Sequence, residues 1–265
     1  TKGNVYLGQL KMMDASEENK LLIEFLKLCD SFRRLKVRTN ADTPEDARKA
    51  RFFGAEGIGL FRTEHMFYGK GSEEALFKLR KMIISKTEGE RRKALDELFV
   101  HVKSDIKGTL EAMQGFPVTV RLLDPPLHEF IPREEKQQNE LAQSLGIDLE
   151  EFKKRANALH ESNPMMGHRG VRLGITYPEV TEMQGRAVFE AAAELLKQGI
   201  KAEPEIMVPV VCAVKELTDQ QAIFKKIYQE VLRKYNLKKI PHMFGTMIEI
   251  PRAALIADKL AEVAE

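Results

Sequence analysis

Cysteine is scarce in this sequence, and long apolar runs are absent. The two cysteines, Cys29 and Cys212, lie far apart and without the spacing of a metal site. We therefore expect incidental or buried thiols and a reducing compartment, either the cytoplasm or an organelle such as a plastid. No apolar run approaches the roughly 20 residues that span a bilayer, and Thr1-Lys2-Gly3 does not begin a signal peptide. These absences predict a soluble protein with no membrane partner.

An excess of charge of one sign is also absent. Forty-two basic residues face 40 acidic ones, and the formal net charge of +2 is spread along the chain. This balance gives no electrostatic footprint for nucleic acid, so we expect a small molecule or another domain as the partner. The chain does have a hydrophobic content of 43% in 265 residues, enough for one sizeable core.

Strand-like and helix-like segments alternate along the chain. Helices are expected where capping sequences occur, such as Thr43-Pro44 with Asp46, and Thr87 with Glu90. Strand-like runs separate these helices at 35–38, 58–61, 118–123, 206–211 and 242–250. Such alternation favours a parallel sheet with right-handed crossovers. We predict an α/β fold, an incomplete (β/α)8 TIM-type barrel of about five parallel strands in sequential order.

Two segments lie outside this repeat. Apolar residues recur at helical spacing over 16–34, where Ser16 can cap a linker helix. From 133 to 162 the composition turns polar and charged, which predicts an inserted lobe with a helix after Asp148. The expected domains are thus 1–34 and a barrel segment over 35–265.

Charged residues interrupt or end the apolar strand-like runs. They are Arg38, Arg62, Arg121 and Glu249. Burying an ion costs on the order of several kcal/mol, so an opposite charge or a ligand must compensate these side chains. The carboxyl ends of parallel strands form the ligand face, where three guanidiniums would suit an anion bearing carboxylate and phosphate. The alternative is an Arg–Glu ion-pair network that braces the sheet.

Glu249 has no basic neighbour in its own segment, which indicates a hard-cation ligand, and we expect that cation to be Mg²⁺. A partner carboxylate is expected beyond residue 265, since Asp124 is followed by two prolines that indicate a rigid turn. The glycines of the loop 163–170 permit close approach to a ligand, and Arg169 would add positive charge there. His168 taken alone is read as structural.

Four segments carry a family resemblance. They read Gly-Ile-Gly-Leu-Phe-Arg-Thr-Glu-His-Met-Phe at 57–67, Val-Thr-Val-Arg-Leu-Leu-Asp-Pro-Pro-Leu-His-Glu-Phe at 118–130, Asn-Pro-Met-Met-Gly-His-Arg-Gly at 163–170, and Gly-Thr-Met-Ile-Glu-Ile-Pro-Arg at 245–252. Together they resemble the pyruvate, phosphate dikinases over nearly the whole chain. Enzyme I of the sugar phosphotransferase system and phosphoenolpyruvate synthase share the barrel, but Arg-Thr-Glu-His and Asp-Pro-Pro-Leu-His-Glu look like the dikinase branch.

The resemblance implies the phosphoenolpyruvate (PEP)/pyruvate-binding barrel of a multidomain transferase that converts ATP, pyruvate and phosphate to AMP, PEP and pyrophosphate. It implies as partners a swivelling phosphohistidine domain, whose end would lie at 5–10, and an ATP-grasp domain. By the family pattern, Arg62 and Arg121 would hold the phosphoryl group and the developing enolate oxygen. Arg169 would assist at the same anion, and Glu249 would bind Mg²⁺. Arg38 comes from the charge argument and ranks below these residues as a substrate ligand.

Family features that we do not find predict a fragment. The resemblance leads us to expect an Asn-Asp strand end and a catalytic cysteine, and Cys212 does not match the context of that cysteine. We therefore expect the chain alone to be inactive in the complete reaction. Two other functions stay open, a Mg²⁺-dependent pyruvate-enolate lyase or aldolase and a noncatalytic binding module. Five strands would leave two sheet edges, to be covered by a displaced C-terminal helix or by a second chain in a homo-oligomer.

Overall fold

The computed structural model describes residues 3–10, 19–69 and 71–265, and the chain divides into the units Thr1–Lys36 and Val37–Glu265. In the first unit the predicted helix is present as α1 (Lys20–Phe32). Asn19 caps it by accepting a hydrogen bond from the Leu22 amide at 3.1 Å. The expected cap, Ser16, lies outside the described residues.

The second unit is built on an open parallel sheet. Its strands are β1 (Thr39–Asn40), β2 (Ile58–Arg62), β3 (Pro117–Arg121), β4 (Glu203–Val208) and β5 (Met243–Thr246). They pair in the order β1-β2-β3-β4-β5, each pair parallel. The predicted α/β class, strand order and open sheet are confirmed.

Several strand bounds differ from the prediction. The first strand is not at 35–38, because regular pairing begins only at Thr39, although the Glu56 amide already donates to the Val37 carbonyl. The fourth strand runs from 203 to 208 and stops where Val210 takes a φ of 66°. The fifth strand ends at Thr246, so Glu249 lies in the turn before Pro251 opens the next helix, and not within the strand.

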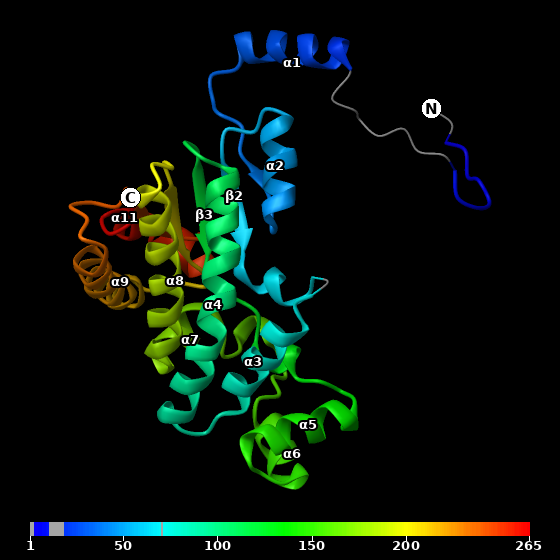
Figure 1. Cartoon of the computed structure of the whole chain (residues 1–265), viewed down its shortest axis with the longest axis vertical. Helices are drawn as coiled ribbons and strands as arrows, with labels where there is room; N and C mark the ends of the chain where they lie inside the picture. The colour runs from blue at the N-terminus through cyan, green and yellow to red at the C-terminus, as the bar shows by residue number, and fades with distance from the viewer. Residues whose placement is uncertain (1–2, 11–18, 70) are drawn as a thin grey trace. The chain divides into compact units, whose positions relative to one another are not determined.

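Four helices pack side by side and cover one face of the sheet (Figure 1). They are α2 (Pro44–Phe52), α4 (Glu88–Ala112), α8 (Pro178–Lys197) and α9 (Val214–Tyr235). The predicted caps are present, because the Thr43 side chain accepts from the Asp46 amide and Thr87 forms a capping box with Glu90. The core lies between these helices and the sheet and includes buried Leu98, Val120 and Ile206.

The segment predicted as a lobe contains two helices, α5 (Glu135–Leu145) and α6 (Leu149–Ala158). Asp148 caps α6, as its sequence predicted, by accepting a hydrogen bond from the Glu151 amide at 2.7 Å. Helix α5 was not predicted, since its start has no side-chain cap. Both helices share a small cluster around Phe152 next to α3 (Glu73–Ile84).

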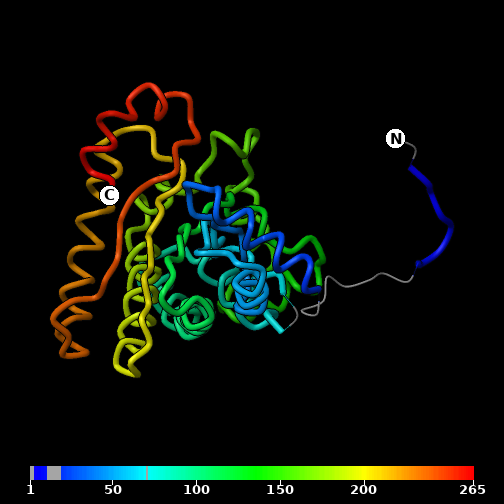
Figure 2. Tube along the Cα trace, turned by 90° about the horizontal axis from the view of Figure 1, so that it is seen from above, coloured from blue at the N-terminus to red at the C-terminus, as the bar shows by residue number. Residues whose placement is uncertain are grey.

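The end of the chain returns to the sheet. The short helices α10 (Pro251–Leu255) and α11 (Ala257–Ala261) lead it back, and α11 packs against α9 (Figure 2). The Glu265 amide donates to the Phe244 carbonyl at 3.0 Å, and the Phe244 amide donates to Oε2 of Glu265 at 3.0 Å. The last residue therefore satisfies the outer edge of β5 at Phe244, while cover by a second chain stays a prediction. Among the described residues, no helix has the length and apolarity to cross a membrane.

Candidate functional site

Arg62, the last residue of β2, is held by a carboxylate from the loop before α2. Its Nη2 lies 2.5 Å from Oδ2 of Asp42, and its Nε and backbone amide donate to Oδ1 at 3.1 and 3.0 Å. Nδ1 of His65 lies 3.0 Å from Oδ2 of Asp42. Burial would raise the pKa of Asp42, but the hydrogen bonds from Arg62 outweigh it and lower this pKa. Asp42 therefore stays ionised and fixes the Arg62 guanidinium.

Arg121 ends β3 and is paired in register with Arg62 on the neighbouring strand. Its guanidinium forms an ion pair with Glu64, and Nη1 lies 3.0 Å from Oδ2 of Asp124. The side chains of Arg121, Glu64 and Asp124 are only 12%, 5% and 3% exposed. Burial raises the pKa of Glu64 against the opposing effect of Arg121. This is a nearly dry ion-pair network.

Two polar atoms of this network have no partner among the described residues. They are Nε of Arg121 and Oε2 of Glu64, and both are buried. Buried polar atoms are nearly always hydrogen-bonded to protein, water or a ligand. The two atoms therefore offer a donor and an acceptor at the carboxyl ends of the strands, where ligands bind in parallel sheets.

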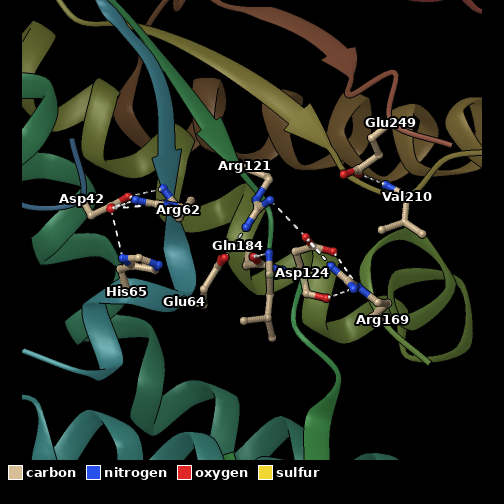
Figure 3. Close-up of polar contacts among 11 residues, drawn as sticks. Asp42, Arg62, Glu64, His65, Arg121, Asp124, Arg169, Gln184, Val210 and Glu249 are labelled. Atoms are coloured by element: carbon tan, nitrogen blue, oxygen red, sulfur yellow. Dashed lines mark hydrogen bonds and ion pairs between the residues drawn. The ribbon is translucent and has the colours of Figure 1, made fainter. Parts of the chain in front are cut away.

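Arg169 joins the same network from the start of α7 (Gly170–Thr176). Its Nη2 lies 2.8 Å from Oδ2 of Asp124, and its Nε donates to Oδ1 at 3.1 Å. Asp124 thus bridges Arg121 and Arg169 (Figure 3). Arg62 and Arg121 end neighbouring strands, as the charge argument predicted, and Arg169, which was expected from the glycine-rich loop, is joined to Arg121 through Asp124.

Arg38 lies elsewhere. Its Nη1 is 2.5 Å from Oε2 of Glu205 and 3.3 Å from Oγ1 of Thr119, which itself donates to Glu205 at 2.7 Å. Thr119 precedes Arg121 by two residues on β3, so this group sits in the middle of the sheet, at a cavity of about 350 Å³ lined also by Met207. The expectation that Arg38 would converge with the strand-end arginines is wrong, because Arg38 precedes β1 and does not follow it.

Glu249 lies after β5, and the Val210 amide donates to its Oε1 at 2.7 Å (Figure 3). No hydrogen bond to Oε2 is found among the described residues, which also contain no cluster of three or more groups able to hold a metal ion. Mg²⁺ commonly takes one or two protein carboxylates and completes its coordination with substrate oxygens and water. A single hard oxygen donor, close enough to Arg169 to influence its pKa, fits such a site.

Asp124 is not available as the second metal ligand. Both of its oxygens are engaged by guanidiniums, Oδ1 by Arg169 and Oδ2 by Arg121 and Arg169. The prolines after Asp124 indicate a rigid turn, and nothing in the sequence predicts that its carboxylate bridges two guanidiniums. Asp42 and Glu64 were also missed as counter-charges, although Glu64 follows Arg62 within two residues.

The loop 163–170 is held by contacts with the residues that flank it. Oε1 of Glu161 accepts the His168 amide at 2.8 Å, and a Cβ on Gly167 would meet Glu161 at 2.6 Å. Arg172 donates to the Gly167 carbonyl at 2.8 Å. Burial lowers the pKa of His168, so its imidazole is neutral at pH 7. Arg172 and His168 therefore shape the loop, and Arg169 is the member of this segment that reaches the network.

Cys212 lies in the β4–α9 loop and is half-buried. Its amide donates to Oε2 of Glu216 at 2.7 Å, and its Sγ lies 3.6 Å from Oε1 of Glu216. Burial, together with Glu216, raises the pKa of the Cys212 thiol. A protonated thiol is a poor nucleophile, in agreement with a structural cysteine.

Comparison with known proteins finds one family model and several similar dikinases. The family model described as "PEP-utilising enzyme, PEP-binding domain" matches residues 16–265. The chain is 48% identical over 264 residues to pyruvate, phosphate dikinase of Clostridium symbiosum, covering 99% of this chain and 30% of the relative. It is 51% identical over 243 residues to pyruvate, phosphate dikinase 1, chloroplastic, of Arabidopsis thaliana, covering 91% of this chain and 25% of the relative.

A third relative, pyruvate, phosphate dikinase 2 of Zea mays, is 50% identical over 265 residues, covering 99% of this chain and 30% of the relative. The chain therefore spans less than a third of the length of these relatives. The strands, the arginine network and the Glu249 turn all lie within the residues that the family model matches. The chain belongs to the PEP-binding domain family of the PEP-utilising enzymes.

Proposed function

We propose that this chain is the PEP/pyruvate-binding part of a pyruvate, phosphate dikinase, the transferase that converts ATP, pyruvate and phosphate to AMP, PEP and pyrophosphate. The observation that carries the proposal is Arg121, a largely buried guanidinium paired in register with Arg62, whose Nε has no partner among the described residues. The names of the relatives support the same reaction. The same names give no support to the alternative, a Mg²⁺-dependent pyruvate-enolate lyase.

Arg62 and Arg121 would bind the phosphoryl group and the oxygen that becomes the enolate. When PEP gives up its phosphoryl group it leaves a pyruvate enolate, whose negative charge needs preorganised cations in a site that excludes water. Asp42 and Glu64 hold the two guanidiniums before substrate arrives. Because the orientation is fixed in advance, little reorganisation is needed when the charge develops.

Arg169 would bind the same anion, with Asp124 setting its distance from Arg121. Glu249 would hold Mg²⁺, which supplies positive charge at the enolate and carboxylate oxygens when bound. The bidentate contact between Arg169 and Asp124 leaves Nη1 of Arg169 beside Met165. That nitrogen is the donor of Arg169 that a substrate oxygen would reach without breaking the bridge.

The complete reaction would need a swivelling phosphohistidine domain and an ATP-grasp domain as partners. The length of the relatives supports this, since the chain covers only 30% of the first of them. We propose that the chain on its own does not form ATP from PEP, AMP and pyrophosphate. A coupled ATP assay tests this, and a rate that disappears in Glu249→Gln would contradict it. The parent protein would work in the cytosol or in a plastid, where relatives named chloroplastic act.

Calorimetry with oxalate, a mimic of the enolate, tests the binding site in the presence of Mg²⁺. Arg121→Ala and Arg62→Ala should each weaken oxalate binding at least tenfold, and Glu249→Gln should remove its dependence on Mg²⁺. Arg92→Ala is the control, since Arg92 is an exposed residue of α4 paired with Glu88 and Glu182. Unchanged affinity in Arg121→Ala would show that the network only braces the sheet.

A further inference from the structure

Val210 has a backbone conformation that is rare for its residue type. Its φ is 66°, and Asn236 is the other non-glycine with positive φ among the described residues. Asn236 ends α9 in an ordinary left-handed cap, but a β-branched valine in this region is strained. Such strain persists only where the surrounding structure holds it, and it is concentrated at functional sites. Val210 follows β4 and is 4% exposed.

The contacts of the 209–210 peptide explain why it keeps this conformation. The Val210 amide donates to Oε1 of Glu249 at 2.7 Å, and the Pro209 carbonyl accepts from the Val171 amide at 3.0 Å. The peptide is thereby tied to the turn after β5 on one side and to the first turn of α7 on the other. Its two polar groups both have partners, so the unusual conformation leaves no backbone group unsatisfied.

Gly170 lies directly against this peptide. A Cβ at position 170 would lie 2.7 Å from Cγ2 of Val210, 2.9 Å from its Cβ and 3.0 Å from the Pro209 carbonyl oxygen. Gly170 also has a φ of 54°, which favours glycine. Any other residue here would push the 209–210 peptide away from its present place. Arg169, the preceding residue, is bonded to Asp124.

We infer that Val210 is a positioning residue for Glu249, and that Gly170 and the 209–210 peptide form a clamp which fixes the Glu249 carboxylate relative to Arg169. The Val210 amide occupies Oε1 of Glu249 and leaves Oε2 for a divalent cation. Mutation of a group that orients a metal ligand commonly weakens metal binding about tenfold or more. The inference rests on the proposed function, in which Glu249 is the Mg²⁺ ligand.

Binding of Mn²⁺ in the presence of oxalate, followed by electron paramagnetic resonance, tests the clamp without any turnover. Gly170→Ala should weaken Mn²⁺ binding at least fivefold. Gly146→Ala is the matched control, because Gly146 also has a left-handed φ, 67°, but a Cβ there meets nothing within 4 Å. It should lower the melting temperature through backbone strain alone and leave Mn²⁺ affinity within twofold of the parent chain.

Two variants at position 210 keep the test valid if Gly170→Ala does not fold. Val210→Gly keeps the amide and tolerates the left-handed φ, so Mn²⁺ affinity should stay within twofold. Val210→Pro removes the amide donor and cannot adopt the φ of 66°, so binding should weaken at least tenfold. Parent-like Mn²⁺ binding by Val210→Pro or by folded Gly170→Ala would overturn the inference.

Glu249→Gln separates this inference from the proposed function. If Glu249→Gln binds Mn²⁺ as the parent does, Glu249 is not the metal ligand and both proposals fail. If it loses Mn²⁺ while Gly170→Ala and Val210→Pro retain it, only the clamp is wrong.

Hydrogen exchange of the Val210 amide gives a readout that needs no strained variant. This amide should exchange slowly in the parent chain and at least tenfold faster in Glu249→Ala, and equal rates would overturn the inference.

Discussion

Two ion-pair networks in this chain differ in how completely their polar atoms are satisfied. On the helical face, Glu190 accepts from Lys234 and Tyr235, and Glu194 accepts from Lys103, Lys107 and Tyr235. None of these side chains has an unpartnered buried atom. At the strand ends, Arg121 and Glu64 each keep one buried atom that has no partner in the described part of the chain. A network that only braces the fold can use all its hydrogen bonds, whereas a binding site keeps some for the ligand.

The largest expected effect comes from breaking the strand-end network at its centre. Arg121→Met would leave Glu64 and Asp124 buried without their shared cation, so the free energy of unfolding should fall by about 3–5 kcal/mol. Urea denaturation at pH 7 measures it. Arg121→Met combined with Glu64→Gln should recover part of the loss, since one uncompensated charge is removed. A loss below about 1 kcal/mol in the single variant would mean that the network is well hydrated.

Asp124→Asn tests whether the bridge orients two arginines for an anion. The amide of asparagine has no negative charge and only one acceptor oxygen, so it cannot hold both Arg121 and Arg169 as the carboxylate does, and oxalate affinity should fall about tenfold, or about 1.4 kcal/mol. The matched control from the other network is Glu194→Gln, which also removes a carboxylate shared by two cations. Calorimetry should show parent-like oxalate binding in Glu194→Gln. Equal losses in both variants would remove the distinction between the networks.

The helical network should instead appear in the pH dependence of stability. Burial would raise the pKa of Glu194, but the hydrogen bonds from Lys103 and Lys107 outweigh it and lower this pKa to about 2 from its ordinary 4.5. A depressed folded-state pKa means that the stabilisation is complete above about 4.5 and is lost as the pH falls toward 2. Melting temperatures from pH 6 to 2.5 should therefore fall less steeply in Glu194→Gln. An equally steep fall of the melting temperature in the parent chain and in Glu194→Gln would contradict the pairing of Glu194 with Lys103 and Lys107.

The smallest effect is expected at Arg92. Its side chain is 46% exposed, and its pairs with Glu88 and Glu182 lie at the surface of α4 and α8. Exposed pairs contribute about 0–1 kcal/mol, so Arg92→Ala should change the free energy of unfolding by less than about 1 kcal/mol. Urea denaturation with and without about 0.5 M salt checks this, because salt at that concentration screens surface charges. A loss above about 2 kcal/mol would place Arg92 with the buried networks.

Much of the fold could be predicted because its signals are local. Capping residues such as Thr43, Thr87 and Asp148 fix helix starts within one turn, and five apolar runs gave the strand order. Strand ends were less predictable, because tertiary contacts decide them. Val210 belongs to an apolar run, yet the contacts of its peptide with Glu249 and α7 end β4 two residues before it.

The site could be predicted only in part for the same reason. The positions of Arg62, Arg121 and Arg169 near the strand ends could be predicted, because a charge at the end of an apolar strand or in a glycine-rich loop is visible in the sequence. Their carboxylate partners were missed, since Asp42 meets Arg62 across 20 positions of the chain. Arg38 was misplaced because the sequence did not reveal that its strand begins one residue after it and that Glu205 faces it.

A crystal structure of the chain with oxalate and Mn²⁺ would show whether the strand-end arginines bind the substrate. We expect oxalate within hydrogen-bonding distance of Arg62 and Arg121, with Mn²⁺ between oxalate and Oε2 of Glu249. Nε of Arg121 should then have an acceptor, while Asp124 still joins Arg121 to Arg169. Oxalate bound beside Arg38 and Glu205, or an Arg121 that contacts only Glu64 and Asp124, would contradict the claim that the strand-end network is the binding site.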